Sequence, residues 1–254
     1  KASSESSIVR LPGPMAAAVD AGTTNKLTPY DATAVVGLAR DMGAYESAFT
    51  NASILVVRAT NITLGGAGYN TIGAAVNASR GGDVIEAYAG VYNEAVDITG
   101  RTNLTIRARA WALSNDMTNT VVDPQGLGYG FNIANSHGNR VVGFRIRHGA
   151  TYGVYITGTS RTNRVAHCDI VSNATAAVYL NGGAVARSVV ATNRLRGPGQ
   201  QYGVWISGSS TNFVLDNDAY RNTVIGVRIA SGGLGNEIRR DRIYSNTSFG
   251  IYIC

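Results

Sequence analysis

The chain has 254 residues, a formal net charge of +6, 31 glycines and a charged fraction of only 15%. This composition suits a turn-rich all-β chain with one large core and argues against a helical enzyme. The charge is uneven, because residues 1–128 carry nine Lys and Arg against eleven acids, whereas residues 129–254 carry thirteen Arg against five acids. The two cysteines, Cys168 and Cys254, are too few for a disulfide framework.

The first 49 residues are predicted to form a separate N-terminal arm. Residues 15–49 contain Ala18-Val-Asp-Ala-Gly22 and Arg40-Asp-Met-Gly-Ala-Tyr-Glu46. This pattern resembles the closing segment of large secreted bacterial β-helix proteins, in which it follows a β-helix rather than preceding one. The resemblance implies that residues 1–49 are the end segment of an upstream β-helix module. The alternative is a chance match of six residues.

Residues 52–109 are expected to open the main fold. Apolar side chains fall at helical spacing at Ile72, Ala75 and Val76, so we predict a short helix that covers the open end of the first coil. Thr71-Ile-Gly-Ala-Ala-Val-Asn-Ala78, with Val84–Glu94 after it, resembles the entry of pectin lyase-like β-helix proteins. The resemblance implies the fold and an extracytoplasmic setting, but it implies no single activity, because this fold hosts enzymes, adhesins and stalks. Residues 110–128 are expected to loop out before the regular repeats.

From Tyr129 to Cys254 one short phrase occurs six times, at steps of 23, 24, 26, 23 and 24 residues. The copies are Tyr129-Gly-Phe-Asn-Ile133, Tyr152-Gly-Val-Tyr-Ile156, Ala176-Ala-Val-Tyr-Leu180, Tyr202-Gly-Val-Trp-Ile206, Ile225-Gly-Val-Arg-Ile229 and Phe249-Gly-Ile-Tyr-Ile253. Apolar residues alternate with variable ones inside each copy, as in a strand with one buried face. We predict an all-β fold, a right-handed single-stranded parallel β-helix over residues 50–254, with coils of about 22–26 residues.

Two further positions repeat with the phrase. Its second residue is glycine in five copies, and we attribute this to a sharp turn of the chain. Asn139, Asn163, Asn212 and Asn236 each follow a phrase by nine or ten residues, with Ala186 in the missing slot. We expect these asparagines to stack as a ladder at a corner of the coil.

Candidate catalytic residues are sparse. Asp216 and Asp218 lie one coil before Arg240 and Arg242, and pectate lyases combine carboxylates that bind Ca²⁺ with an arginine base. The alternative is an ordinary ion-pair ladder that needs no Ca²⁺ or other cofactor. Lyases of this fold with a lysine base are disfavoured, since no lysine follows Lys26, and the acidic motifs of polygalacturonases and mannuronan epimerases are missing. The histidines fall in different columns, which argues against a shared metal site: His137, His148 and His167.

The outward position of the phrase is the candidate ligand-binding surface. Its aromatic and basic members are Tyr155, Tyr179, Trp205, Arg228 and Tyr252. Aromatic rings on adjacent coils suit the faces of sugars, and arginine suits an anionic glycan. Two alternatives stay open: the rings cover one another, or a loop covers them. Nucleic acid is a weaker candidate because lysine is nearly absent, and no apolar run is long enough to span a membrane.

These observations lead to two hypotheses about function. The first is a non-catalytic module of a larger extracellular or cell-surface protein, acting as a stalk, a glycan-adhesive surface or a self-assembling unit. In this hypothesis residues 15–49 pack against the last coil of a neighbouring copy, which gives head-to-tail chains. The second is a polysaccharide lyase or glycoside hydrolase that acts on an acidic polysaccharide through the region of Asp216 and Arg240.

Overall fold

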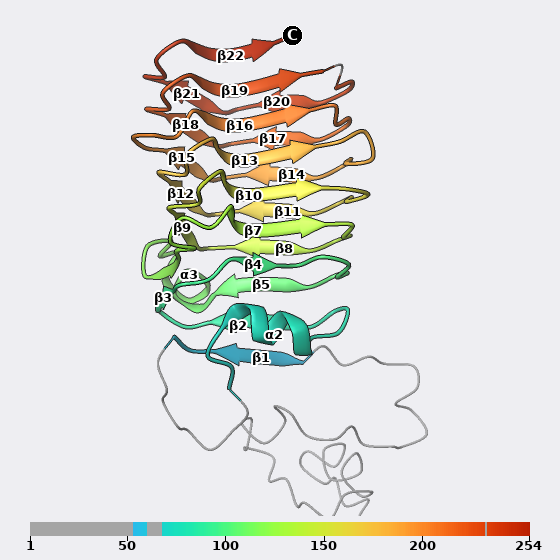
Figure 1. Cartoon of the computed structure of the whole chain (residues 1–254), viewed down its shortest axis with the longest axis vertical. Coiled ribbons are helices and arrows are strands. Elements are labelled where there is room, and N and C mark those ends of the chain that lie inside the picture. Colours follow the sequence, from blue (N-terminus) through green and yellow to red (C-terminus); the bar gives the residue numbers. More distant parts are fainter. Residues whose placement is uncertain (1–52, 60–67, 232) are drawn as a thin grey trace, which may run out of the picture.

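The computed structural model describes residues 53–59, 68–231 and 233–254, and these form a solenoid of stacked coils (Figure 1). Each regular coil contributes one strand to each of three parallel sheets, here called sheets A, B and C. The predicted N-terminal arm, residues 1–49, lies outside the described residues. The predicted parallel β-helix is confirmed over the part of residues 50–254 that the structure describes.

The strands of each sheet follow one another along the axis. Sheet A contains β1 (Ile54–Val57), β2 (Val84–Ala87), β5 (Thr105–Ala108), β8 (Arg140–Val142), β11 (Arg164–Ala166), β14 (Val189–Ala191), β17 (Phe213–Leu215) and β20 (Glu237–Arg239). Sheet B contains β3 (Gly90–Tyr92), β6 (Thr120–Val122), β9 (Arg145–Arg147), β12 (Asp169–Val171), β15 (Arg194–Arg196), β18 (Asp218–Tyr220) and β21 (Arg242–Tyr244). Sheet C contains β4 (Val96–Asp97), β7 (Tyr129–Ala134), β10 (Tyr152–Thr157), β13 (Ala176–Asn181), β16 (Tyr202–Ser207), β19 (Ile225–Ala230) and β22 (Phe249–Ile253).

The repeated phrase forms sheet C, and its strands pair in the predicted register. Val154 lies opposite Phe131 on one side and Val178 on the other, so the first apolar column stacks along the axis. The side chains of this column are fully buried from Phe131 to Val227. The core of the molecule is therefore a stack of similar apolar layers, each enclosed by three short strands.

The regular spacing of glycine in the phrase has a different cause from the predicted one. These glycines do not adopt positive φ values, so no sharp turn requires them. A Cβ atom at Gly153 would lie 2.4 Å from Cγ2 of Ile170 and 2.7 Å from the carbonyl oxygen of Ala177. Gly226 is equally confined by Ile243 and by the carbonyl oxygen of Gly250. Lack of space between sheets B and C, rather than a turn, accounts for the glycine column.

Asparagines form three ladders rather than one. In the predicted ladder, the Asn163 side chain accepts from the Asn139 N–H at 3.0 Å, but the missing slot belongs to Ser188 and not to Ala186. The loop between β13 and β14 is longer than the equivalent loops, so Ser188 rather than Ala186 directly precedes β14. The two ladders that were not predicted from the sequence consist of Asn193, Asn217 and Asp241, and of Asn173, Gln200, Asn222 and Asn246.

Two short helices accompany the first coils. Helix α2 (Ile72–Ala78) confirms the predicted helix, and it buries Ile72, Ala75 and Val76 beneath β4. Helix α3 (Arg109–Ser114) corrects the predicted loop at 110–128, which also contains strand β6. Trp111 of α3 packs closely against Gly143. A Cβ atom added to Gly143 would lie 2.4 Å from the Cβ atom of Trp111. Packing against the coil thus supports a helix with no side-chain cap at its start.

Candidate functional site

Sheet B carries a column in which basic and acidic side chains alternate. Register pairs Arg145 with Asp169, Asp169 with Arg194, Arg194 with Asp218, and Asp218 with Arg242. Opposite charges that face each other on neighbouring strands stabilise a sheet, whereas like charges destabilise it. The alternation places arginines on every second coil, so that no arginine faces another arginine within this column.

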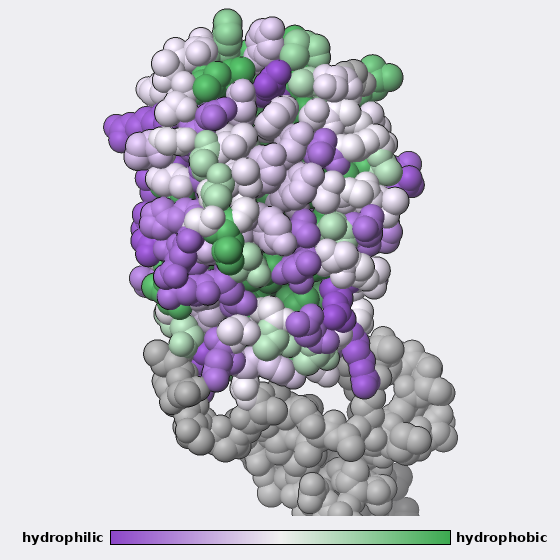
Figure 2. Space-filling view, in the orientation of Figure 1, coloured by the Kyte–Doolittle hydropathy of each residue, from purple (hydrophilic) through white to green (hydrophobic). Residues whose placement is uncertain are grey.

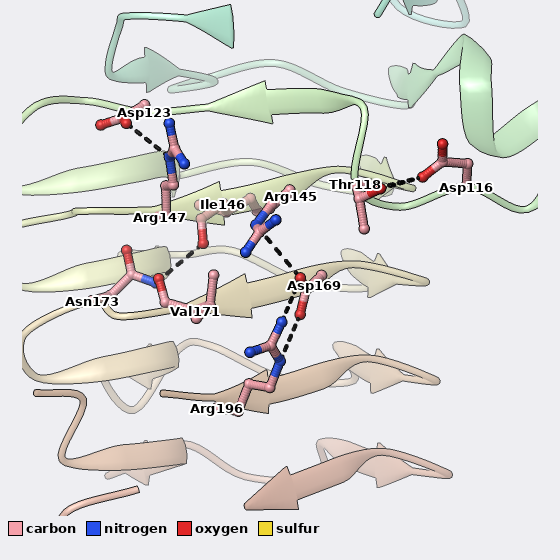
Figure 3. A network of polar contacts seen from close by, with 10 residues as sticks. All are labelled: Asp116, Thr118, Asp123, Arg145, Ile146, Arg147, Asp169, Val171, Asn173 and Arg196. Carbon is pink, nitrogen blue, oxygen red and sulfur yellow. Dashed lines mark hydrogen bonds and ion pairs between the residues drawn. The ribbon is translucent and has the colours of Figure 1, made fainter. Parts of the chain in front are cut away.

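Asp169 is the centre of the most buried ion-pair cluster, shown in Figure 3. The Nε and Nη2 atoms of Arg196 donate to its two carboxylate oxygens at 3.1 and 3.0 Å, and Arg145 Nε lies 3.6 Å away. The Asp169 side chain is 1% exposed, so this two-point contact with Arg196 is needed to compensate for its lost hydration. The cluster could not be found from the sequence, because Asp169 and Arg196 come together only through the strand register.

A second carboxylate, Asp123, follows β6, two coils before Asp169, and is drawn in the same view (Figure 3). It accepts a hydrogen bond from Arg147 Nε at 2.9 Å, and Nδ1 of His148 lies 3.0 Å from the same oxygen. Burial alone would raise the pKa of Asp123, but hydrogen bonds from the Gln125 N–H, His148 and Arg147 outweigh burial and lower it. Asp123 is therefore an ionised structural partner and not a proton donor.

The predicted catalytic residues form two separate pairs. Asp216 and Arg240 occupy equivalent left-handed corners between sheets A and B, where Arg240 donates two hydrogen bonds at 2.7 and 2.8 Å. The hydrogen bond from Arg240 holds the pKa of Asp216 below its usual range. Asp218 and Arg242 lie opposite each other on sheet B and form an ion pair, with Arg242 Nε 3.5 Å from Asp218 Oδ1. All four belong to interactions between consecutive coils, and the geometry joins them as ladder pairs instead of one four-residue cluster.

Asp241 lies between the two predicted arginines but points inward. Its Oδ1 atom accepts from both the N–H and the side-chain amide of Asn217, each at 2.7 Å. Burial is the main cause of a raised pKa at Asp241. Its Oδ2 atom is buried and has no hydrogen-bond partner among the described residues. Asp241 is the last described member of an asparagine ladder, and its raised pKa has a structural origin.

The predicted ligand-binding column forms a stack along sheet C. Ring centres lie 5.5 Å apart for Tyr155 and Tyr179 and 4.4 Å apart for Tyr179 and Trp205. The Arg228 guanidinium continues the stack 5.2 Å above the Trp205 ring. Tyr179 is only 8% exposed, because its ring is covered on both faces. The edges of the rings therefore face the solvent, whereas the faces of the rings contact the rings of neighbouring coils.

Two tyrosines outside the predicted column complete this cluster. Tyr152 lies 4.8 Å from the Tyr179 ring, and Tyr202 lies 5.1 Å from the Trp205 ring. Both begin the repeated phrase, and their aromatic character was the signal that could have placed them here. Tyr252, the last predicted member, lies opposite Arg228 in register and stacks on Phe249 at 5.3 Å.

The remaining reactive residue types are dispersed. In the described ranges, no three His, Cys, Asp or Glu side chains gather as a metal site would require. His148 contacts Asp123, whereas His167 stacks on Trp111 at 4.8 Å, so they lie in different surroundings. Burial raises the pKa of the Cys168 thiol to about 12, which keeps it protonated. None of the helices in the described part of the chain has the length and apolar character needed to cross a membrane.

Comparison with known proteins agrees with this architecture. A family model described as a right-handed β-helix region matches residues 44–218, and the chain belongs to this family. The resemblance to pectin lyase-like β-helix proteins is thereby confirmed at the level of the fold, although the motif at Asp41–Glu46 stays untested. A search of curated proteins finds no match.

Solved structures with a similar fold include two proteins whose names refer to polysaccharides. An alginate lyase from Paenibacillus sp. strain FPU-7 has 12% identity and a TM-score of 0.56, with 67% of this chain and 62% of the lyase covered. A pectin methyl esterase from the rice weevil has 15% identity and a TM-score of 0.43, with 72% of this chain and 65% of the esterase covered. The chain thus spans less than two thirds of each, and these similarities concern the fold alone.

Proposed function

We propose that the chain is a non-catalytic β-helix module of an extracellular or cell-surface protein, with a rigid body that adheres to glycans. One observation carries this proposal: each candidate catalytic carboxylate pairs with an arginine on the neighbouring coil. A general acid or base needs a pKa near the working pH. The hydrogen bond with Asp216 raises the pKa of Arg240, which is the opposite of what an arginine base requires, and it lowers the pKa of Asp216, which is the opposite of what a proton donor requires.

The aromatic column supports the adhesive part of the proposal. Ring edges and the phenol groups of Tyr155 and Tyr252 lie along one face, parallel to the solenoid axis. Phenol and indole groups combine apolar surface with a hydrogen-bonding group, as sugar contact requires.

Turnover of acidic polysaccharides tests the proposal directly. The purified chain would be incubated with polygalacturonate and with alginate, with and without Ca²⁺, while unsaturated products and new reducing ends are measured. We expect no product from the wild type or from an Asp216→Ala, Arg240→Ala variant. Product formation by the wild type that disappears in this variant would instead establish the alternative, a polysaccharide lyase or hydrolase.

The last coil supports a further part of the same proposal, association in head-to-tail chains. Phe249, Ile251 and Ile253 are 53%, 48% and 69% exposed, and hydrophobic side chains gather on this coil at the top of Figure 2. Among the described residues nothing pairs with the outer edges of β20, β21 and β22. Unpaired parallel strands are templates for further strands. In this proposal residues 15–49 of a neighbouring copy cover the coil.

A further inference from the structure

Four arginines without acidic partners among the described residues surround the corner where each coil enters sheet A. Arg140 and Arg164 lie directly opposite each other in strands β8 and β11. Arg161 precedes the same corner on the coil of Arg164. On the next coil Ala186 pairs with Arg161, and Arg187 directly follows Ala186. The four guanidinium groups therefore belong to three successive coils, which rise by about 4.8 Å each. Arg140, Arg161 and Arg187 are exposed, and Arg164 is half-buried.

The sequence around this patch leaves these charges uncompensated. Between Asp123 and Asp216 the chain contains a single acid, Asp169, and that acid is bound to arginines on sheet B. None of the four patch arginines takes part in an ion pair within the described residues. The patch thus concentrates four positive charges at one corner of the coil.

Sheet B provides an internal comparison. There every arginine of the alternating column faces an aspartate, although the strands have the same length and spacing as those of sheet A. Arg140 facing Arg164 is the unfavourable arrangement, since like charges directly opposite each other destabilise a sheet. The chain therefore places aspartates opposite the arginines of this sheet B column, and it ion-pairs Arg107 and Arg239 of sheet A, but it leaves Arg140 and Arg164 without an acid. A bound anion would remove the repulsion that the chain itself does not remove.

The chemistry of the patch limits the ligand. Guanidinium groups bind carboxylate and sulfate groups through paired hydrogen bonds. Thr162, Ala186 and Ser188 between the arginines are small, so a flat extended chain can approach the backbone there, and the exposed His137 lies opposite Arg161 on the preceding coil. We propose that Arg140, Arg161, Arg164 and Arg187 bind an acidic polysaccharide that lies along the solenoid axis. This inference deepens the proposed adhesive function and rests on it for the choice of ligand.

Nucleic acid fits the patch less well. Proteins that bind single strands stack the bases on exposed aromatic rings. Among the described outward positions of sheet A, Phe213 is the only aromatic residue, and it lies two coils beyond Arg164. The ring of Trp111 is already stacked on His167. A linear chain of uronic or sulfated sugars can bind to arginines without exposed aromatic rings.

Two charge-matched double variants test the site. Arg140→Gln, Arg164→Gln removes two charges from the patch, and Arg194→Gln, Arg221→Gln removes two exposed charges from the side of sheet B. Binding to polygalacturonate would be measured by biolayer interferometry at low and moderate salt, with single-stranded and double-stranded DNA as other probes. We expect affinity to fall by at least about tenfold in the patch variant and by no more than about twofold in the control.

The possible outcomes separate this inference from the proposed function. Equal losses in both variants, or no loss in the patch variant, would overturn the site while leaving glycan adhesion by another face. DNA binding that is tighter than polysaccharide binding, or no polysaccharide binding by the wild type, would overturn the assigned ligand. Cleavage of the probe would contradict the non-catalytic function, yet the patch would stand if its variant alone lost affinity. Thermal melting of each variant verifies that it is folded.

Discussion

At Gly130, Gly153, Gly203 and Gly226, the coil leaves room for a hydrogen atom and nothing larger. The space is limited on one side by an apolar side chain of sheet B and on the other by the carbonyl of the next coil. Ala177 occupies the equivalent place in one coil, so the space is not identical in every layer. The glycine column therefore reports the distance between two sheets, which a single strand cannot reveal.

Replacing Gly153 with alanine should destabilise the protein. The added Cβ would lie within 2.4 Å of Ile170 Cγ2, and overpacking of this kind costs about 1–3 kcal/mol. Gly128→Ala is the matched control, because its Cβ would meet nothing closer than Thr151 Oγ1 at 3.6 Å. Urea denaturation should separate the two variants clearly. Equal stability of both would show that the coil can expand at this position.

Asp241→Asn should stabilise the protein and change its response to pH. In the same ladder, the side-chain amides of Asn193 and Asn217 donate to the carbonyls of Val165 and Val190, and a carboxylate cannot do so. The new hydrogen bond is worth about 1 kcal/mol. The pKa of Asp241 is raised in the folded state, so the folded protein holds the Asp241 proton more tightly than the unfolded chain does. The stability of the wild type therefore falls as the pH rises above about 3.9, the ordinary pKa of an aspartate.

The advantage of the asparagine variant should therefore be smaller at pH 4 than at pH 7 in thermal melts. Asp116→Asn is a control of opposite sign, since hydrogen bonds from Thr118 lower the pKa of Asp116. Its carboxylate contributes stability above about pH 3.9 and loses it as the pH falls. An advantage of Asp241→Asn that does not depend on pH would mean that the pKa of Asp241 is the same in the folded and unfolded states.

At the scale of elements, helix α2 depends on a residue from the following coil. Glu94 accepts hydrogen bonds from the N–H groups of Ile72 and Gly73 at 2.6 and 2.9 Å, and the Thr71 side chain accepts from Ala74 at 3.1 Å. These contacts satisfy three of the N–H groups that the first turn of a helix leaves free. A seven-residue helix is too short to be stable alone, so the contacts attach it to the solenoid.

Glu94→Ala should loosen this cap. It leaves two N–H groups without their acceptor, which should lower the free energy of unfolding by about 1–3 kcal/mol. Glu94→Gln keeps one acceptor oxygen and should lose less, while Thr71→Ala should cost about 1 kcal/mol. Hydrogen exchange of the Ile72 and Gly73 amides would locate the effect. Unchanged protection in Glu94→Ala would exclude a capping role.

At the scale of the whole molecule, the stabilising contacts connect successive coils along the solenoid axis. Apolar columns, asparagine ladders, ion pairs and stacked rings each join a coil to the next one. In such a solenoid each coil is stabilised by its neighbours, and a coil with one open side lacks half of these contacts. The last coil, with its exposed Ile251, is in that position within the described residues.

Association through this coil is a testable expectation. Light scattering should give a mass that rises with protein concentration above that of one chain. Ile251→Lys places a charge among the exposed apolar side chains and should abolish the rise, whereas Leu113→Lys on α3, also exposed, should not. A wild type that keeps the mass of one chain at high concentration would contradict head-to-tail association.

Much of the fold could be predicted because its signal is local and repeated. The step between the six phrases determined that Phe131, Val154 and Val178 stack, and helical spacing at Ile72 and Val76 determined α2. The asparagine spacing predicts Ala186 in the missing ladder position, whereas the register places Ser188 there, because loop lengths vary between strands of constant pattern. Helix α3 was missed because its support comes from Trp111 packing on Gly143.

The candidate site divides in the same way. The repeat spacing is enough to show that Asp216 precedes Arg240 by one period and that aromatic residues recur at the outward position of the phrase. The folded chain is needed to show that the rings cover one another, that Asp241 points inward, and that Arg140 faces Arg164 without an acid. The physical reason is that a repeat determines which residues stack, whereas register and loop length determine which charges and rings meet across coils.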